Sequence, residues 1–393
     1  MQLILFDDNS RDSLLPLTFT RPVSDLRVGI LKISEKWEQE LGLASSPLTV
    51  DYLRGKFPCL LGEDNLLING ALLPDTNIVS AIEKLDNEQA LIHEGTLLAV
   101  RASGRIAEEF DSRSWIKNGL EYEGDLSLVD RPWKIFTLNG QEIEADFQRL
   151  TKGRTSQMLS ETVQVDKPEN VFVEPGFQGG YFTLNASRGP IYLGKDSEIM
   201  EGCMIRGPFA LCEGAVVKMG AKIYGPTTLG PFCRAGGEIN NSVLQANSNK
   251  GHDGFLGNSV LGEWCNLGAD TNNSNLKNNY GEVKIWNYPA RKFVGTGRQF
   301  CGLIMGDHSK CGINTMFNTG TVIGVSANIF GPGFPPTFIP SFSWGGAEGF
   351  SEYKLDKALE TAKLVLERRG MQLSQDDRAI LNHIHQYSMV FRS

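Results

Sequence analysis

Hydrophobic residues recur at every sixth position through the middle of the chain. Each step of six from Leu193 to Ala235 lands on an aliphatic residue, and hydrophobic residues return at the same spacing from Met305 to Ile329. An α-helix repeats every 3.6 residues and a β-strand every 2, so neither gives a period of six. A parallel β-helix does, because each hexad forms one short strand and a corner, and three hexads close one coil. Chance spacing in a glycine-rich region is the alternative, and we predict a parallel β-helix over residues 186–335.

Short apolar segments alternate with amphipathic ones before these repeats. The predicted elements are a strand at 1–6, a helix at 28–43, a strand–turn–strand or strand–loop segment at 59–73 with its turn at 62–65, a helix at 75–85, a strand pair at 90–100 and a helix at about 140–151. Alternation of strands and helices is typical of an α/β domain, which we place at 1–150. Residues 151–185 are then a connector.

Two further segments depart from the hexad pattern. Residues 270–300 are rich in asparagine and carry five Lys or Arg residues. A long loop that leaves a rigid solenoid is usually a binding element, and a disordered surface insertion is the alternative. Residues 336–393 are expected to form a C-terminal helical extension. Its two helices, at 352–369 and from Ser374 to about 388, would cap the last coil or contact another subunit.

Composition restricts the class of protein. The 393 residues carry a net charge of −8, which argues against a nucleic-acid partner held by electrostatics. No apolar run reaches membrane-spanning length and the N-terminus does not resemble a signal peptide, so we expect a cytoplasmic protein without membrane insertion. The seven cysteines include no CxxC pair, and we interpret them mainly as small packing residues, with zinc ligation as the alternative.

The hexad register is briefly lost around His252, in the segment 249–257. Such a break lets a side chain leave the stack and face a cleft. A histidine there suits a general base, because its pKa lies near neutrality. A hydrogen-bonded histidine in the coil wall is the alternative. His308 is the only other histidine in the repeats, and two are too few for a carbonic-anhydrase type of site with three metal-binding histidines.

The sequence around His252 resembles the acetyltransferase half of the bifunctional glucosamine-1-phosphate N-acetyltransferase/N-acetylglucosamine-1-phosphate uridylyltransferases (GlmU-type), which are hexapeptide acyltransferases. The matching residues are Lys250-Gly251-His252, Phe255-Leu256-Gly257, Asn266-Leu267-Gly268-Ala269, Thr271 and Asn275. The resemblance covers about 200–335. It implies a left-handed β-helix, a homotrimer with acetyl-CoA bound between neighbouring subunits, and a role in UDP-N-acetylglucosamine supply for the cell envelope.

The resemblance also implies roles for individual residues in acetyl transfer. His252 would take a proton from the sugar amine as the amine attacks the thioester, and Asn275 would hold the histidine or the new amide. Ala269 would offer backbone groups to the thioester, where an N–H stabilises the oxyanion. Lys310 and Ile313 would lie beside acetyl-CoA, with Ile313 in place of a serine of the family.

The contacts to the acceptor are altered relative to the family. Lys222 stands in place of a phosphate-binding arginine, and Asn266 would contact the sugar. Asn240 replaces a second phosphate-binding lysine, and Phe255 replaces a sugar-contacting tyrosine. The acceptor can therefore differ from glucosamine-1-phosphate. As a hypothesis, one of two loop lysines supplies the lost phosphate contact: Lys277 or Lys284.

The segment 15–22 resembles the one that follows the nucleotide loop of sugar-phosphate nucleotidylyltransferases. In that family a glycine-rich loop cradles the triphosphate, whereas residues 7–12 here contain no glycine and three carboxylates. Asp7 and Asp8 would instead hold Mg²⁺. The candidate phosphate ligands, for which salt bridges to nearby aspartates are the alternative, are Arg11, Arg21 and Arg27.

The function predicted from the sequence is an acetyl-CoA-dependent N-acetyltransferase acting on an amino-sugar phosphate. The N-terminal domain is predicted to be nucleotidylyltransferase-like, and it either retains transfer from UTP, binds a sugar nucleotide without catalysis or is purely structural. Two alternatives remain for the whole chain. One is a non-catalytic sugar-nucleotide-binding or scaffold protein, and the other is an acyltransferase that takes its acyl group from an acyl carrier protein.

Overall fold

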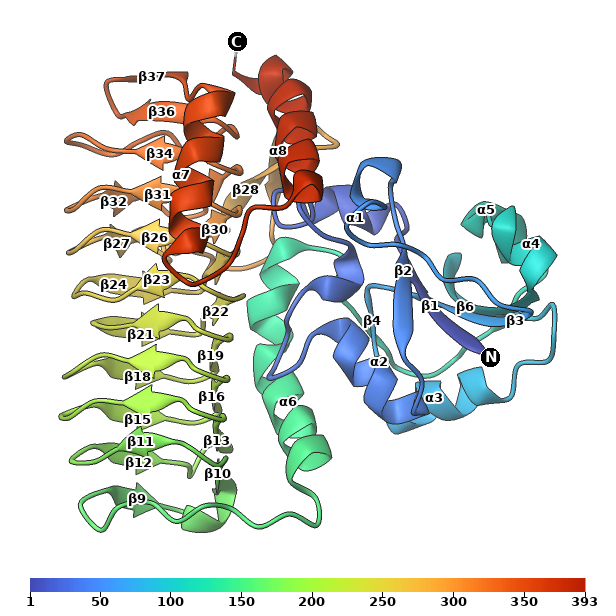
Figure 1. The fold of residues 1–393 in the computed structure, drawn as a ribbon, viewed down its shortest axis with the longest axis horizontal. Coiled ribbons are helices and arrows are strands. Elements are labelled where there is room, and N and C mark those ends of the chain that lie inside the picture. The colour runs from blue at the N-terminus through green and yellow to red at the C-terminus, as the bar shows by residue number, and fades with distance from the viewer. Residues whose placement is uncertain (393) are drawn as a thin grey trace. The chain divides into compact units, whose positions relative to one another are not determined.

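The computed structural model describes residues 1–392, except for the side chains of residues 105 and 106. The chain divides into two compact units, each described by itself. The first unit comprises Met1–Leu14, Thr20–Leu26 and Leu31–Arg131, and the second comprises Leu15–Phe19, Arg27–Ile30 and Pro132–Ser393. The predicted fold class is confirmed: an α/β domain is followed by a left-handed parallel β-helix and C-terminal helices (Figure 1).

A six-stranded mixed sheet forms the centre of the first unit. Its strands, in spatial order, are β2 (Ser45–Leu48), β1 (Gln2–Phe6), β3 (Asp64–Asn69), β6 (Thr96–Ser103), β5 (Ala90–His93) and β7 (Leu120–Glu121). The remaining strand pair is β4 (Leu72–Leu73) with β8 (Ser127–Leu128), and the helices are α1 (Ser10–Ser13), α2 (Ile33–Leu41), α3 (Thr76–Glu83), α4 (Gly104–Glu108) and α5 (Ser112–Ile116). Strand β1 runs parallel to both β2 and β3, so the carboxyl ends of these three strands meet at one edge.

Several predicted elements of this unit are confirmed. The strand at the N-terminus is β1, and the strand pair around Gly95 is the hairpin β5–β6, with Gly95 at a φ of +75°. Asp75 caps α3 because its Oδ1 accepts hydrogen bonds from the backbone N–H groups of Asn77 and Ile78, at 2.7 and 3.0 Å.

Three predicted boundaries are wrong. Helix α2 starts at Ile33 rather than 28, since Gly29 adopts a φ of +83°, which is incompatible with a helix. The residues predicted as the turn at 62–65 include the start of β3, because Asp64 pairs with Arg101 of β6 at 3.1 Å. Helix α6 begins at Pro132, eight residues before the predicted start, since proline is favourable in the first turn of a helix.

The second unit is a solenoid with three parallel sheets. The β10 sheet contains β10 (Val171–Val173), β13 (Ile191–Leu193), β16 (Phe209–Leu211), β19 (Thr227–Leu229), β22 (Val243–Leu244), β25 (Val260–Leu261), β30 (Ile304–Met305), β33 (Val322–Ile323) and β35 (Phe338–Ile339). The β11 sheet contains β11 (Gln178–Gly179), β14 (Glu198–Ile199), β17 (Val216–Val217), β20 (Arg234–Ala235), β23 (Asn249–Lys250), β26 (Asn266–Leu267), β31 (Lys310–Cys311), β34 (Asn328–Ile329), β36 (Ser343–Gly346) and the antiparallel β37 (Gly349–Glu352).

The third face of the solenoid is the β9 sheet. It contains β9 (Gln164–Asp166), β12 (Thr183–Asn185), β15 (Met204–Arg206), β18 (Lys222–Tyr224), β21 (Glu238–Asn240) and β24 (Phe255–Gly257), and a separate pair is formed by β27 (Asn272–Asn273) and β32 (Met316–Phe317). All thirteen hexad positions from Leu193 to Ala235 and from Met305 to Ile329 lie in one buried cluster inside the coils. The coils extend beyond the predicted range at both ends, from β9 to β36. The first coils are filled by Phe177, Phe182 and Leu184.

Helices and one hairpin cover parts of the solenoid (Figure 1). Helix α6 (Pro132–Thr151) lies along the β10 sheet, where its Ile143 and Phe147 belong to the same buried cluster as Phe172 and Tyr192. The insertion at 270–300 is folded rather than disordered. It forms the hairpin of β28 (Lys284–Asn287) and β29 (Lys292–Gly295), whose Trp286 stacks on Phe338 with ring centroids 4.2 Å apart.

Two helices follow the last coil, as predicted. They are α7 (Leu355–Glu367), and α8 (Gln375–Tyr387), which is capped by Ser374. His385 of α8 contacts Glu352 of β37 at 2.7 Å, so α8 is tied to the end of the solenoid. Helix α7 runs along the β11 sheet (Figure 1).

Candidate functional site

A cavity of about 580 Å³ lies between the β11 sheet and the end of α7. It brings together five of the residues singled out in the sequence: His252, Asn266, Ala269, Lys310 and Ile313. We call this cavity the β11 groove. Its other lining residues include four further cations, described below, and Val365 of α7.

The strand register explains how the groove is assembled. Asn249 pairs with Asn266, and Asn266 pairs with Lys310, so these residues stand one above the other on successive coils. Along a strand, successive side chains point to opposite faces. The neighbours Leu267 and Cys311 lie in the core, so Asn266 and Lys310 face outward.

His252 lies at the corner between β23 and β24, and its side chain is exposed. Gly254 at the end of this corner has a φ of +115°. Within residues 1–392 no hydrogen-bond partner holds the imidazole, so both ring nitrogens are open to a ligand. The structure therefore does not show the alternative raised by the sequence, in which hydrogen bonds fix His252 in the coil wall. An exposed imidazole beside a groove can accept a proton from a bound nucleophile.

Positive charge dominates the groove. Its cations are Lys218, Arg234, Lys310, Arg368 and Arg369. Among the described residues that line it, none is acidic. Burial, followed by the charges of Arg234 and Arg368, lowers the pKa of Arg369. Burial also lowers the pKa of Lys310, whose Nζ donates to the carbonyl of His308 at 2.9 Å. Like charges that lack an acidic neighbour attract an anion.

Helix α7 contributes to the groove through the residues that follow its last turn. Arg369 Nη1 donates to the carbonyl of Phe232 at 3.3 Å, and its Nη2 lies 3.5 Å from Asn249 Oδ1. These contacts hold the guanidinium at the groove, so α7 and the coils share in building the site.

The predicted acceptor residues lie on a different face of the same chain. Lys222, Asn240 and Phe255 belong to the β9 sheet, where Lys222 lines a separate cavity of about 690 Å³. Asn275 donates from Nδ2 to Asn258 Oδ1 at 2.8 Å and does not line the β11 groove. Within a single chain these four residues therefore do not line the β11 groove.

The two loop lysines also lie outside the groove. Lys277 Nζ donates to the carbonyl of Glu282 at 2.6 Å, and Lys284 is the exposed first residue of β28. A phosphate contact by either of them stays a prediction.

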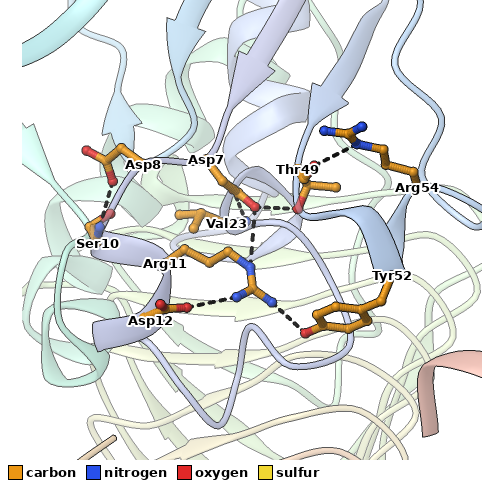
Figure 2. A network of polar contacts seen from close by, with 9 residues as sticks. All are labelled: Asp7, Asp8, Ser10, Arg11, Asp12, Val23, Thr49, Tyr52 and Arg54. Atoms are coloured by element: carbon orange, nitrogen blue, oxygen red, sulfur yellow. Dashed lines mark hydrogen bonds and ion pairs between the residues drawn. The ribbon is translucent and has the colours of Figure 1, made fainter. Parts of the chain in front are cut away.

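A second group of candidates lies in the first unit, at the edge where β1, β2 and β3 end (Figure 2). Asp7 is buried, and its carboxylate accepts hydrogen bonds from the Val23 N–H at 2.9 Å and from Thr49 Oγ1 at 2.5 Å. Burial raises the pKa of Asp7 to about 6. Asp8 accepts from the Ser10 N–H at 2.8 Å and from Asn69 Nδ2 at 2.9 Å. A Mg²⁺ ion held by Asp7 and Asp8 would bind carboxylate oxygens that already accept these hydrogen bonds.

The predicted phosphate-binding arginines are also engaged in the fold. Arg11 donates to Asp12 Oδ1 at 2.9 Å and to the Tyr52 hydroxyl at 2.5 Å (Figure 2), and Arg21 lies 3.7 Å from Asp25. Arg27 belongs to the second unit and donates to the carbonyl of Ile30. No group of three or more His, Cys, Asp or Glu residues among those described is arranged to hold a metal ion.

Comparison with known proteins adds information mainly about the first unit. Residues 3–155 match the family model described as sugar nucleotidyl transferase. This match covers less than half of the chain and agrees with the predicted nucleotidylyltransferase-like domain. A search of curated proteins found no significant match.

Solved structures of two acyltransferases are similar to part of the chain. The Arabidopsis UDP-N-acetylglucosamine acyltransferase is 15% identical, with a TM-score of 0.24, over 55% of this chain and 78% of that one. The Francisella novicida UDP-N-acetylglucosamine acyltransferase is 10% identical, with a TM-score of 0.21, over 60% of this chain and 76% of that one. Similarity at this level carries no inference about function. No helix in the described part of the chain has the length and apolar character needed to cross a membrane.

Sequence analysis missed several residues of the β11 groove. Lys218 and Arg234 follow the same outward alternation as Asn266, so the strand pattern could have indicated them. The pair Arg368-Arg369 was visible at the end of a predicted helix, but its position at the groove depends on how α7 packs. The sequence presents Lys250 only as part of the motif at His252, whereas the structure places it inside the coil.

Proposed function

We propose that the second unit is an acyltransferase that moves an acetyl group from acetyl-CoA to the amine of an amino-sugar phosphate. The observation that carries this proposal is the exposed His252 imidazole at a groove lined by five cations and, among the described residues, by no acid. The imidazole suits deprotonation of an amine, and the cations suit a donor that carries phosphates.

The reaction follows from these groups. A ring nitrogen of His252 accepts a proton from the amine as its lone pair attacks the thioester carbonyl. The new C–N bond creates a tetrahedral oxyanion, and the backbone N–H of Ala269, a groove residue, is our candidate for its stabilisation. Collapse of this intermediate breaks the C–S bond, and the protonated His252 returns the proton to the leaving thiolate.

The acceptor contacts require a second copy of the chain in this proposal. Lys222, Phe255 and Asn275 lie away from the groove of their own chain. In a homotrimer, the β9 face of one subunit meets the β11 groove of its neighbour and supplies these residues. Lys222 then binds the sugar phosphate, and Phe255 packs against the sugar ring.

The direct test is release of free thiol from acetyl-CoA with glucosamine-1-phosphate as acceptor. His252→Gln removes the base and is expected to lower the rate about 10²–10⁴-fold. The control is His93→Gln in the first unit, where the ring nitrogen contacts the carbonyl of Tyr122, and its rate should equal that of the wild type. Absence of thiol release by the wild type with this acceptor, UDP-glucosamine and other amino sugars would refute the proposal.

We propose nucleotidyl transfer as a second function, favoured by the family match of residues 3–155. Asp7, Thr49 and Asn69 lie at the carboxyl ends of β1, β2 and β3, the edge where open α/β sheets bind ligands. The test is pyrophosphate release from UTP and N-acetylglucosamine-1-phosphate in the presence of Mg²⁺. If none is released, titration with UDP-N-acetylglucosamine distinguishes a sugar-nucleotide-binding unit from a purely structural one.

A further inference from the structure

Lys250 occupies a position inside the coil that is otherwise hydrophobic. The strand register of the β11 sheet places it in a single inward column with Ile199, Val217, Ala235, Leu267, Cys311 and Ile329. Lys250 is 1% exposed. A charged group in an apolar column is unfavourable unless polar groups compensate it. A methionine of similar length would fill this space without that cost.

The ammonium group of Lys250 donates its hydrogen bonds to backbone carbonyls, and the charges of Asp253 and Asp270 also favour its protonated form. Nζ donates to the carbonyl of Gly236 at 3.0 Å and to that of His252 at 2.5 Å. No salt bridge to Lys250 is present among the described residues. Burial lowers the pKa of Lys250 to about 8, and either protonation state keeps an N–H donor.

The two carbonyls belong to corners of neighbouring coils. Gly236 follows β20 and His252 follows β23, and these strands are adjacent in the sheet. Lys250 thus joins the corner at His252 to the coil next to it from the inside. Within residues 1–392 no backbone N–H pairs with either carbonyl, so Lys250 satisfies a buried acceptor at Gly236 and a partly buried one at His252.

We propose that Lys250 is a positioning residue for His252. Its ammonium fixes the backbone of the corner at 251–254, and this backbone directs the imidazole outward into the β11 groove. The kinetic consequence rests on the proposed role of His252 as general base. The structural consequence, the fixed direction of the imidazole, does not depend on that role.

The test replaces Lys250 by methionine, which fills the column and removes both hydrogen bonds. Displacement of a catalytic group by about 1 Å lowers a rate about a hundredfold, so we expect that loss in kcat. The KM values for donor and acceptor should stay within threefold of the wild type, because the groove itself is unchanged. The melting temperature should stay close to that of the wild type, because the gain from an apolar side chain in the column offsets the loss of the two hydrogen bonds.

The matched control is Val217→Ala in the same inward column, two coils from Lys250. It leaves a cavity and should lower the melting temperature, whereas kcat should stay within twofold of the wild type. A Lys250→Met protein with wild-type kcat would overturn the proposal. So would a loss of kcat accompanied by loss of acetyl-CoA binding, because the groove would then have collapsed. If Lys250→Met does not fold, Lys250→Gln is used in its place. Glutamine keeps one N–H donor group, so the expected loss of kcat is smaller.

A second readout works without acyl transfer. Diethylpyrocarbonate modifies exposed histidines, and mass spectrometry measures its rate at His252. We expect Lys250→Met to change that rate at least threefold and Val217→Ala to leave it unchanged. If the wild type transfers no acetyl group but this difference is found, the proposed function fails and the positioning role stands. An unchanged rate in Lys250→Met would refute the positioning role.

Discussion

Replacing Arg368 and Arg369 together by alanine should weaken acetyl-CoA binding. Both residues follow the last turn of α7 and line the β11 groove, where they are two of its five cations. Arg369 is partly buried and is held by Phe232 and Asn249, so its guanidinium is already placed for a ligand. Arg368 is exposed and loses more side-chain freedom on binding.

The magnitude follows from these two environments. A hydrogen bond to a charged group contributes about 1.5–3 kcal/mol, and the value for Arg369 should lie within that range. Exposure reduces the contribution of Arg368 to about 0.5–1 kcal/mol. The sum of roughly 2–4 kcal/mol corresponds to a Kd for acetyl-CoA that rises about 30-fold to 1000-fold.

Isothermal titration with acetyl-CoA at low and high salt measures this effect. The affinity of the wild type should fall with salt, and the double variant should show a weaker dependence, because screening acts on the charges that it lacks. Arg378→Ala on α8 removes an exposed cation outside the groove and should leave Kd unchanged. A Kd of the double variant within threefold of the wild type, with its melting temperature preserved, would contradict the role given to α7.

Three further predictions concern stability. Arg154→Met removes a bidentate pair with Glu174 at 2.8 and 2.6 Å and should lower the melting temperature at pH 7. Burial acts to raise the pKa of Glu174, but hydrogen bonds from Arg154 and Tyr192 outweigh it and lower this pKa. The difference in melting temperature between the wild type and Arg154→Met should therefore disappear as pH falls through the lowered pKa. Burial raises the pKa of Asp7 from 3.8 to about 6, so the wild type should lose stability as pH rises across that interval. Asp7→Asn should abolish that loss and add about 1–3 kcal/mol at pH 8 in urea unfolding. Ile223→Ala inside the coils should cost about 2–5 kcal/mol in the same assay, and a cost below 1 kcal/mol would contradict close packing there.

The solenoid could be predicted because its pattern is set by burial alone. Each hexad residue from Leu193 onward points into the coil, and the sequence has no freedom to place a polar group there without compensation. Lys250 shows the limit of this rule. It takes an inward position, and only the structure reveals the two carbonyls that make it tolerable.

The wrong turn boundary at 62–65 arises from polar residues with specific partners. Asp64 and Asn65 are typical of turns, yet both lie in β3. The Asp64 carboxylate pairs with Arg101 of the neighbouring strand β6, and Asn65 bonds to the backbone of Ala102 and of Gly62. The pair of Asp64 and Arg101 links residues 37 positions apart, so no local pattern predicts it.

The candidate site could be predicted in part. The motif at His252 led to Asn266 and Ala269, which the structure places in the same groove. The cations of α7 could not be located, because their position depends on the packing of a helix about a hundred residues further along. The predicted partners on the β9 sheet lie on another face, so their role depends on a second subunit.

The path of the chain through the two units limits how this protein can be divided or recombined. Residues 27–30 belong to the second unit, where the Gly29 N–H donates to Asn139 and the Ile30 N–H donates to Asp146, both at 2.8 Å. A fragment that starts at Pro132 would lack residues 27–30. The buried side chains of Asn139 and Asp146 in α6 would then lose the hydrogen bonds from these two backbone N–H groups. No single cut therefore yields both units intact, and exchange of the first unit for another domain would have to preserve this short segment.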